Sequence, residues 1–207
     1  DRYLHENDLE NGDVASDHDH RFEEDIRMMK EGGQNSYRFS LSWPRIIKNK
    51  EGEINEKGLA FYQRLLDACH KYDIEPFVTI YHWDLPQYWE EEGGWLNNKV
   101  AYAFEHLAKV CFEHFGDKVR NWTTFNEPKW FIANGYFIGN YPPGLQDVQK
   151  TMVGAYNVML ASALGVRAFR EGDYQGQIGI VHSYTPVNGV DDTIETRVAM
   201  RYADNYC

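Results

Sequence analysis

The sequence predicts an α/β fold with parallel strands and, among such folds, favours a barrel of β/α units. Segments typical of strands and of helices alternate along the whole chain, with connections long enough to cross over between parallel neighbours. Polar and aromatic residues follow the strands at their C-terminal ends, where a β/α barrel builds its active site. A doubly wound sheet would normally have a glycine-rich phosphate turn after an early strand, and the sequence has none.

Strands are predicted where β-branched and aromatic residues form short runs that a proline or a turn ends. The run over residues 36–43 alternates and meets Pro44, and the run over residues 74–83 meets Asp84-Leu85-Pro86. Two further strands are predicted over residues 119–125 and 177–184.

Helices are predicted where apolar residues recur at a spacing of three and four. Phe22, Ile26 and Met29 lie on one face of a first helix over residues 17–33. Asn55 is expected to cap a second helix, and Asn97 or Asn98 a third. Residues 1–16 are expected to be loop, residues 149–171 a fourth helix, and the segment from Thr193 to the end a fifth.

Charge and cysteine content narrow the classes of partner. With 21 basic and 32 acidic side chains the formal net charge is −11, which argues against nucleic acid and against a membrane, since both need a basic face. No uninterrupted apolar stretch approaches the roughly 20 residues of a membrane helix.

Cys69 and Cys111 lie on apolar helical stripes and, with Cys207, indicate buried thiols in a reducing compartment, so a cytoplasmic location is expected.

The strongest candidate for chemistry is Glu127. It follows the buried strand that ends at Phe125-Asn126, and Pro128 prevents the strand from continuing. A carboxylate there contributes little to stability and is well placed to act on a ligand. His82, with Trp43 and Trp83, follows two other strands, and Arg38 lies on the first.

An acid, an amide, an imidazole and aromatic rings are the groups that a glycosidase needs. A carboxylic acid protonates the leaving oxygen while hydrogen bonds to the sugar hydroxyls strengthen in the transition state. The mechanism also requires a second carboxylate, and the sequence offers none at another strand end. Asp84 is the nearest, but its place before Leu85-Pro86 favours a role in the turn.

A metal site is not expected at His18-Asp19-His20. Histidines two residues apart at the start of a helix do not share a face, so capping and solvent exposure are the simpler interpretation. No cofactor is expected either.

Over residues 12–206 the sequence resembles the family 1 glycoside hydrolases, the β-glucosidase and 6-phospho-β-glycosidase group. Four motifs in order carry the resemblance: Gly12-Asp13-Val14-Ala15-Ser16-Asp17-His18 with Arg21-Phe22-Glu23-Glu24-Asp25-Ile26, then Tyr37-Arg38-Phe39-Ser40-Leu41-Ser42-Trp43-Pro44-Arg45-Ile46, then Tyr81-His82-Trp83-Asp84-Leu85-Pro86-Gln87, and finally Thr124-Phe125-Asn126-Glu127-Pro128.

The resemblance implies a role for each strand-end residue. Glu127 would be the general acid/base, Asn126 would bond the sugar 2-hydroxyl and His82 the 3-hydroxyl. Arg38 would hold the nucleophile carboxylate ionised and oriented, and Trp83 would help to wall the pocket.

The resemblance also implies that the chain is part of a larger barrel. It corresponds to about the second to fifth strands of an eight-stranded (β/α)8 TIM barrel and forms one partial domain over residues 1–207. The nucleophile motif of the family is not found in it. Its exposed sheet edges are expected to favour association with another chain.

Three functions stay open at this point. The leading hypothesis is a retaining β-glucosidase that acts on β-linked glucosides. A 6-phospho-β-glucosidase is the alternative within the class, and a non-catalytic sugar-binding fragment is the alternative from another class.

Overall fold

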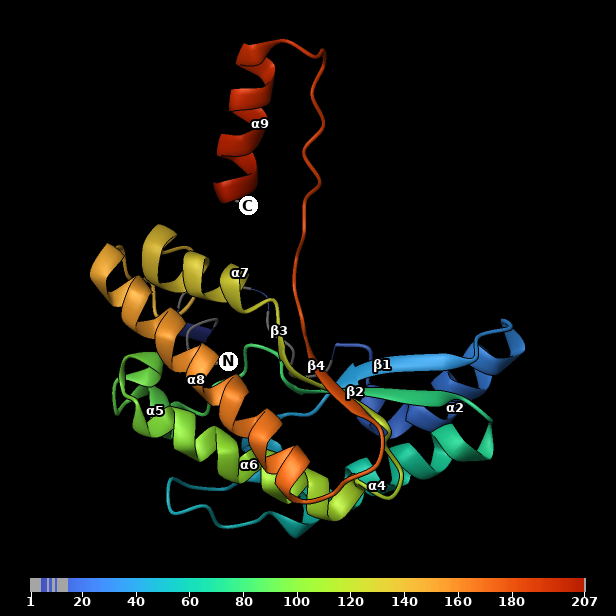
Figure 1. The fold of residues 1–207 in the computed structure, drawn as a ribbon. Helices are drawn as coiled ribbons and strands as arrows, with labels where there is room; N and C mark the ends of the chain where they lie inside the picture. The colour runs from blue at the N-terminus through green and yellow to red at the C-terminus, as the bar shows by residue number, and fades with distance from the viewer. Residues whose placement is uncertain (1–4, 7, 9, 11–14, 207) are drawn as a thin grey trace.

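The protein is built on one sheet of four parallel strands, seen in a computed structural model that describes residues 5, 6, 8, 10 and 15–206 (Figure 1). The strands are β1 (Ser36–Ser40), β2 (Glu75–Tyr81), β3 (Asn121–Asn126) and β4 (Gln177–Val181), and their spatial order is their order in the chain. Each strand pairs in parallel with the next, so all four C-terminal ends lie at the same edge. This is the topology of consecutive units of a β/α barrel.

Helices connect the strands. The longer ones are α2 (His18–Glu31), α4 (Glu56–Lys71), α6 (Lys99–Phe115), α8 (Val148–Glu171) and α9 (Ile194–Tyr206). Short helical segments follow the strand ends: α3 (Trp43–Ile46), α5 (Gln87–Glu90), α7 (Pro128–Ile132), the 3₁₀ turn η1 (Gly94–Leu96) and the π-helical segment η2 (Ala133–Ile138). The short segments were not predicted, because each is too brief to show a helical period.

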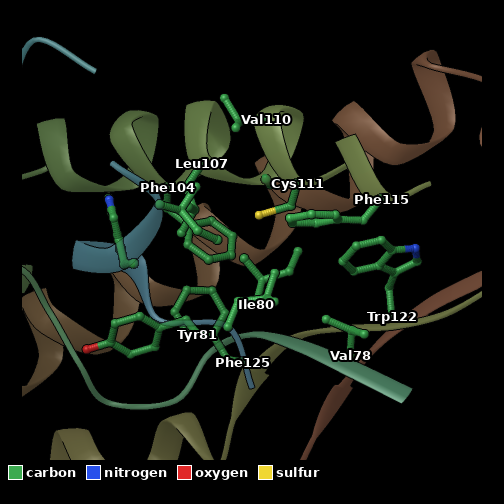
Figure 2. Close-up of a cluster of buried hydrophobic side chains, with 14 of the residues drawn as sticks. Val78, Ile80, Tyr81, Phe104, Leu107, Val110, Cys111, Phe115, Trp122 and Phe125 are labelled. Atoms are coloured by element: carbon green, nitrogen blue, oxygen red, sulfur yellow. The ribbon is translucent and has the colours of Figure 1, made fainter. Parts of the chain in front are cut away.

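The core lies between the sheet and its layer of helices. Figure 2 shows side chains of α6 facing side chains of β2 and β3. Phe104 of α6 stacks on Phe125 of β3 with ring centroids 4.5 Å apart, and neither residue is exposed. Burial of such aromatic pairs is the main source of stability in a layer of this kind.

The predicted strands and helices are present, and the differences lie at their ends. β1 stops at Ser40, three residues before the predicted end, because Pro44 falls in the first turn of α3, where its missing N–H costs nothing. β4 stops at Val181 instead of Tyr184. Asn55 occupies the position before α4, yet its side chain donates to the Arg45 carbonyl and does not cap the helix.

Trp43 is a correction to the predicted set of strand-end residues. It begins α3 and is 1% exposed, and its ring packs edge-on against Tyr81 and Phe104. Trp43 therefore belongs to the core and is not available to a ligand.

β3 carries an irregularity close to its end. Its register against β4 shifts between Thr123 and Asn126, so that three steps along β3 match two steps along β4. Thr124 and Phe125 both turn towards the helices: the Thr124 hydroxyl bonds Ser162 of α8, and Phe125 stacks on α6. Asn126 consequently points to the opposite face, as expected of a β-bulge.

α8 is long and apolar enough to cross a bilayer by length and composition alone, although the sequence was expected to hold no such stretch. Half of the relevant window is buried inside the fold. Val158, Ala161 and Leu164 are buried, and α8 packs on α6, β3 and β4. A core helix shows this combination of features.

One face and two edges of the sheet have no covering element in the described part of the chain. Phe77 of β2 is 38% exposed on the face opposite the helices, and β1 and β4 are the outer strands. The segment 182–193 after β4 is extended, and α9 stands apart from the layered part (Figure 1). Association through the sheet edges stays a prediction.

The cysteine prediction is confirmed for the two cysteines that the structure describes. Cys69 and Cys111 are buried and unpaired, and burial raises the pKa of the Cys69 thiol to about 11. Both thiols therefore stay protonated and act as small apolar side chains. Cys207 lies outside the described residues, and the reducing compartment stays a prediction.

Replacing Phe104 by alanine should lower the free energy of unfolding by about 3–5 kcal/mol, because it empties the site between Phe125 and Trp43. Urea unfolding followed by circular dichroism measures the change. Tyr102→Ala on the same helix is the control: Tyr102 is 55% exposed, so its loss should shift the value by less than about 0.5 kcal/mol. Equal effects of the two variants would contradict the assignment of the core.

Candidate active site

Glu127 and Asn126 lie side by side at the C-terminal end of β3. Glu127 adopts a left-handed backbone (φ 46°) and starts α7, while its N–H donates to the Val181 carbonyl at 2.8 Å. A left-handed conformation is uncommon for a residue with a side chain and costs about 1–3 kcal/mol. The neighbouring strand and α7 together hold this turn.

Arg38 reaches across β2 to the end of β3. Its Nη2 donates to Asn126 Oδ1 at 2.5 Å, and its Nε donates to the Thr79 hydroxyl at 3.2 Å. A guanidinium has donors only, so the amide oxygen of Asn126 must face Arg38. The contact joins two residues 88 positions apart in the chain.

His82 lies within the electrostatic reach of both Arg38 and Glu127. Burial lowers the pKa of this partly exposed imidazole below its ordinary value, and the positive charge of Arg38 lowers it further. The Glu127 carboxylate acts in the opposite direction. The net shift favours a neutral His82 near pH 7, which can donate or accept a hydrogen bond without adding positive charge.

Trp83 also has a left-handed backbone, with φ 76°. Its indole N–H donates to the Asn126 carbonyl oxygen at 2.8 Å, and its ring lies 5.7 Å from the ring of Tyr141. Two adjoining strand ends therefore carry strained residues, which is typical of functional sites. Tyr141 was not predicted, because it comes from a loop with no local pattern.

Two hollows flank these residues. A cavity of about 540 Å³ opens beside the outer strand β1 and is lined by Arg38, Thr79 and His82, among others. A second, of about 420 Å³, is lined by Trp83 and Tyr141. Neither includes Asn126 or Glu127 in its wall.

Asp84 supports the structure of the strand end. Its Oδ2 accepts from the Trp43 backbone N–H at 3.2 Å, tying the loop after β2 to the start of α3. Its Oδ1 is buried, and no partner for it is found among the described residues. Burial raises the pKa of Asp84 to about 6, and hydrogen bonds from Ser42 and nearby backbone groups offset this only in part.

The remaining polar candidates lie elsewhere. His18 pairs with Asp25 and His20 with Asp17, so the two histidines take different partners, and Asp17 forms no side-chain cap.

Sequence reasoning missed a pair of hydroxyls below the site. Thr79 of β2 and Thr123 of β3 face each other with their Oγ1 atoms 2.7 Å apart. Each precedes a predicted site residue by three positions, but only the strand register reveals that they meet.

The sequence matches the family described as glycosyl hydrolase family 1 over residues 1–205. It is 42% identical to β-glucosidase A of Thermotoga maritima, covering 94% of this chain and 44% of that protein. It is 41% identical to a 6-phospho-β-galactosidase of Clostridium acetobutylicum, covering 96% of this chain and 42% of that protein. The chain thus spans less than half the length of these relatives.

Solved structures give the same result. The β-glucosidase from Thermotoga maritima in complex with glucoimidazole superimposes with a TM-score of 0.88 at 42% identity, covering 93% of this chain and 44% of that one. An enzyme from Alicyclobacillus herbarius gives a TM-score of 0.87 at 41% identity, with the same coverage. The prediction of a partial (β/α)8 barrel is confirmed.

The charges around His82 can be tested by titration. Arg38→Met should raise the pKa of His82, because a cation that opposes the imidazolium is removed, and Glu127→Gln should lower it, because a favourable anion is removed. The chemical shift of the His82 ring protons against pH measures both, with the other histidines as internal controls. Identical titration curves would show that His82 does not lie near these groups.

The buried carboxyl of Asp84 should leave a mark on stability. Because the pKa of Asp84 is raised above its unfolded value, ionisation of this carboxyl disfavours the folded state. Its cost to the free energy of unfolding is absent at pH 3 and grows as the pH rises to about 6. In Asp84→Asn the free energy of unfolding should decrease by roughly 1–3 kcal/mol less between pH 3 and pH 6 than in the parent. Urea unfolding between pH 3 and 7 measures it against Asp117→Asn, an exposed control. A slope unchanged by Asp84→Asn would refute the assignment.

Proposed function

Because the chain belongs to glycosyl hydrolase family 1, we propose that it carries the acid/base half of the active site of a retaining β-glucosidase. In this proposal Glu127 protonates the glycosidic oxygen and later activates water, Asn126 and His82 bind sugar hydroxyls, and Trp83 walls the pocket. The observation that carries the proposal is the contact between Arg38 and Asn126, which brings a side chain of β1 across β2 to the end of β3.

The electrostatics of the site support this assignment. The transition state of glycoside hydrolysis has oxocarbenium character, so positive charge develops on the sugar ring. A protonated imidazole beside the ring would oppose that charge, and the lowered pKa of His82 favours the neutral form. Arg38 is turned towards Asn126 and the Thr79 hydroxyl, where its cation can hold a carboxylate from beyond the four strands.

The retaining mechanism needs a second carboxylate roughly 5 Å from the first. Asp84 also follows a strand end, but its contact with the Trp43 backbone assigns it to the turn. The nucleophile would therefore come from outside this sheet. The match covers only 44% of β-glucosidase A of Thermotoga maritima, which leaves more than half of that protein to supply such a residue. A cytoplasmic location remains part of the proposal.

Two alternatives have support of their own. Relatives at similar identity include a 6-phospho-β-galactosidase and an aryl-phospho-β-D-glucosidase from Bacillus subtilis, so a 6-phosphorylated substrate is the alternative within the class. A non-catalytic sugar-binding fragment is the alternative from another class: it would need His82 and Asn126 but no second carboxylate.

The test compares the chain by itself with the chain joined to the part of the Thermotoga maritima β-glucosidase beyond the matched region. Both are assayed with an aryl β-glucoside and with its 6-phosphate. Hydrolysis by the joined protein is expected to fall about 10²–10⁴-fold in Glu127→Gln, the usual contribution of a general acid/base. Glu113→Gln, an exposed acid on α6, is the matched control.

The outcomes separate the three functions. Azide should restore turnover of an activated aryl glucoside in Glu127→Gln, because it replaces the water that the missing base would activate. Preference for the 6-phosphate would establish the first alternative, and glucose binding without hydrolysis in the joined protein would establish the second. Equal activity of Glu127→Gln and the parent would overturn the proposal.

A further inference from the structure

We propose that Thr79 and Thr123 are positioning residues that fix the orientation of the Asn126 side chain by way of Arg38. The substrate part of this inference rests on the proposed function, while its structural part does not. It begins from the polar chain Asn126–Arg38–Thr79–Thr123, which crosses β1, β2 and β3 below the strand ends.

The Thr79 hydroxyl accepts one hydrogen bond and is placed to donate another. Thr79 is 1% exposed, its Oγ1 accepts from Arg38 Nε at 3.2 Å, and the same atom lies 2.7 Å from Thr123 Oγ1. Since Arg38 cannot accept a hydrogen bond, the single hydrogen of Thr79 is free to go to Thr123. A buried hydroxyl that both donates and accepts a hydrogen bond is held in one rotamer.

Fixing Nε fixes the plane of the guanidinium. Arg38 Nη2 then meets Asn126 Oδ1 at 2.5 Å, and the amide oxygen is committed to this contact. The amide NH₂ of Asn126 is left to donate to a ligand. The site therefore selects a ligand with an acceptor oxygen beside Asn126, such as the hydroxyl next to the reacting carbon of a sugar.

Without Thr79 the amide would lose this constraint. Arg38 would keep a single contact to Asn126 and could rotate about it, and a flipped amide would present its oxygen to the ligand. Without the Thr79 hydroxyl, the site should discriminate less between sugars with and without the hydroxyl next to the reacting carbon. The protein should still fold.

Four variants isolate the hydroxyls. Thr79→Val and Thr123→Val remove them at almost constant volume, and Thr79→Ser restores one. Thr124→Val is the matched control, because the Thr124 hydroxyl bonds Ser162 and the Gly179 carbonyl on the helical side of the same strand.

The first measurement needs no activity. The Arg38 Nε–H and Asn126 NH₂ signals of the chain are followed by ¹H–¹⁵N correlation spectra. In Thr79→Val the Nε–H should exchange with water at least about tenfold faster, with partial recovery in Thr79→Ser. Unchanged signals and exchange in Thr79→Val would overturn the proposal. If Thr79→Val does not fold, Thr123→Val on the less buried partner decides by the same criterion.

The second measurement uses the joined protein described above. The ratio of kcat/KM for an aryl β-glucoside to that for the 2-deoxy analogue should fall about tenfold in Thr79→Val and remain at the parent value in Thr124→Val. An unchanged ratio in a folded Thr79→Val overturns the link to specificity. If no variant hydrolyses either substrate, the proposed function fails, while the Arg38 signals still decide the positioning role.

Discussion

The break in strand alternation at Thr124 and Phe125 is the constraint on which the site depends. In a regular strand, Asn126 would follow Thr124 to the helical side. Because the bulge sends both Thr124 and Phe125 into the helical layer, Asn126 returns to the face that carries Arg38 and Thr79. The stacking of Phe125 on Phe104 holds the irregularity in place.

The same edge of the sheet concentrates backbone strain. Trp83 and Glu127 both take left-handed conformations directly after His82 and Asn126, and the Trp83 indole bonds the Asn126 carbonyl. Such conformations persist only where surrounding packing offsets their cost. Here the dense aromatic layer around Phe104, Tyr81 and Trp95 lies immediately below them. The same aromatic layer thus stabilises the core and holds the strand-end residues Trp83 and Glu127 in fixed conformations.

The charges of the site are few and have separate tasks. Arg38 is committed by two hydrogen bonds, His82 favours its neutral form, and Asp84 is tied to the backbone of α3. Glu127 is the acid that directly follows β3 and precedes α7. In the described part of the chain Arg38 thus bonds Asn126 and Thr79 and forms no ion pair with Glu127, as the proposed acid/base role requires.

The sequence by itself determined the order of strands and helices and the parallel topology. It also placed Arg38 on the first strand and His82, Asn126 and Glu127 at strand ends, because these features follow from local periodicity and from crossover length. It misplaced Trp43, whose position after an apparent strand does not reveal that α3 turns it into the core. Only the tertiary structure decided the facing of Asn126 and the meeting of Thr79 with Thr123. Both depend on the register between strands more than 40 residues apart and on one extra residue in β3, and neither leaves a local signal in the chain.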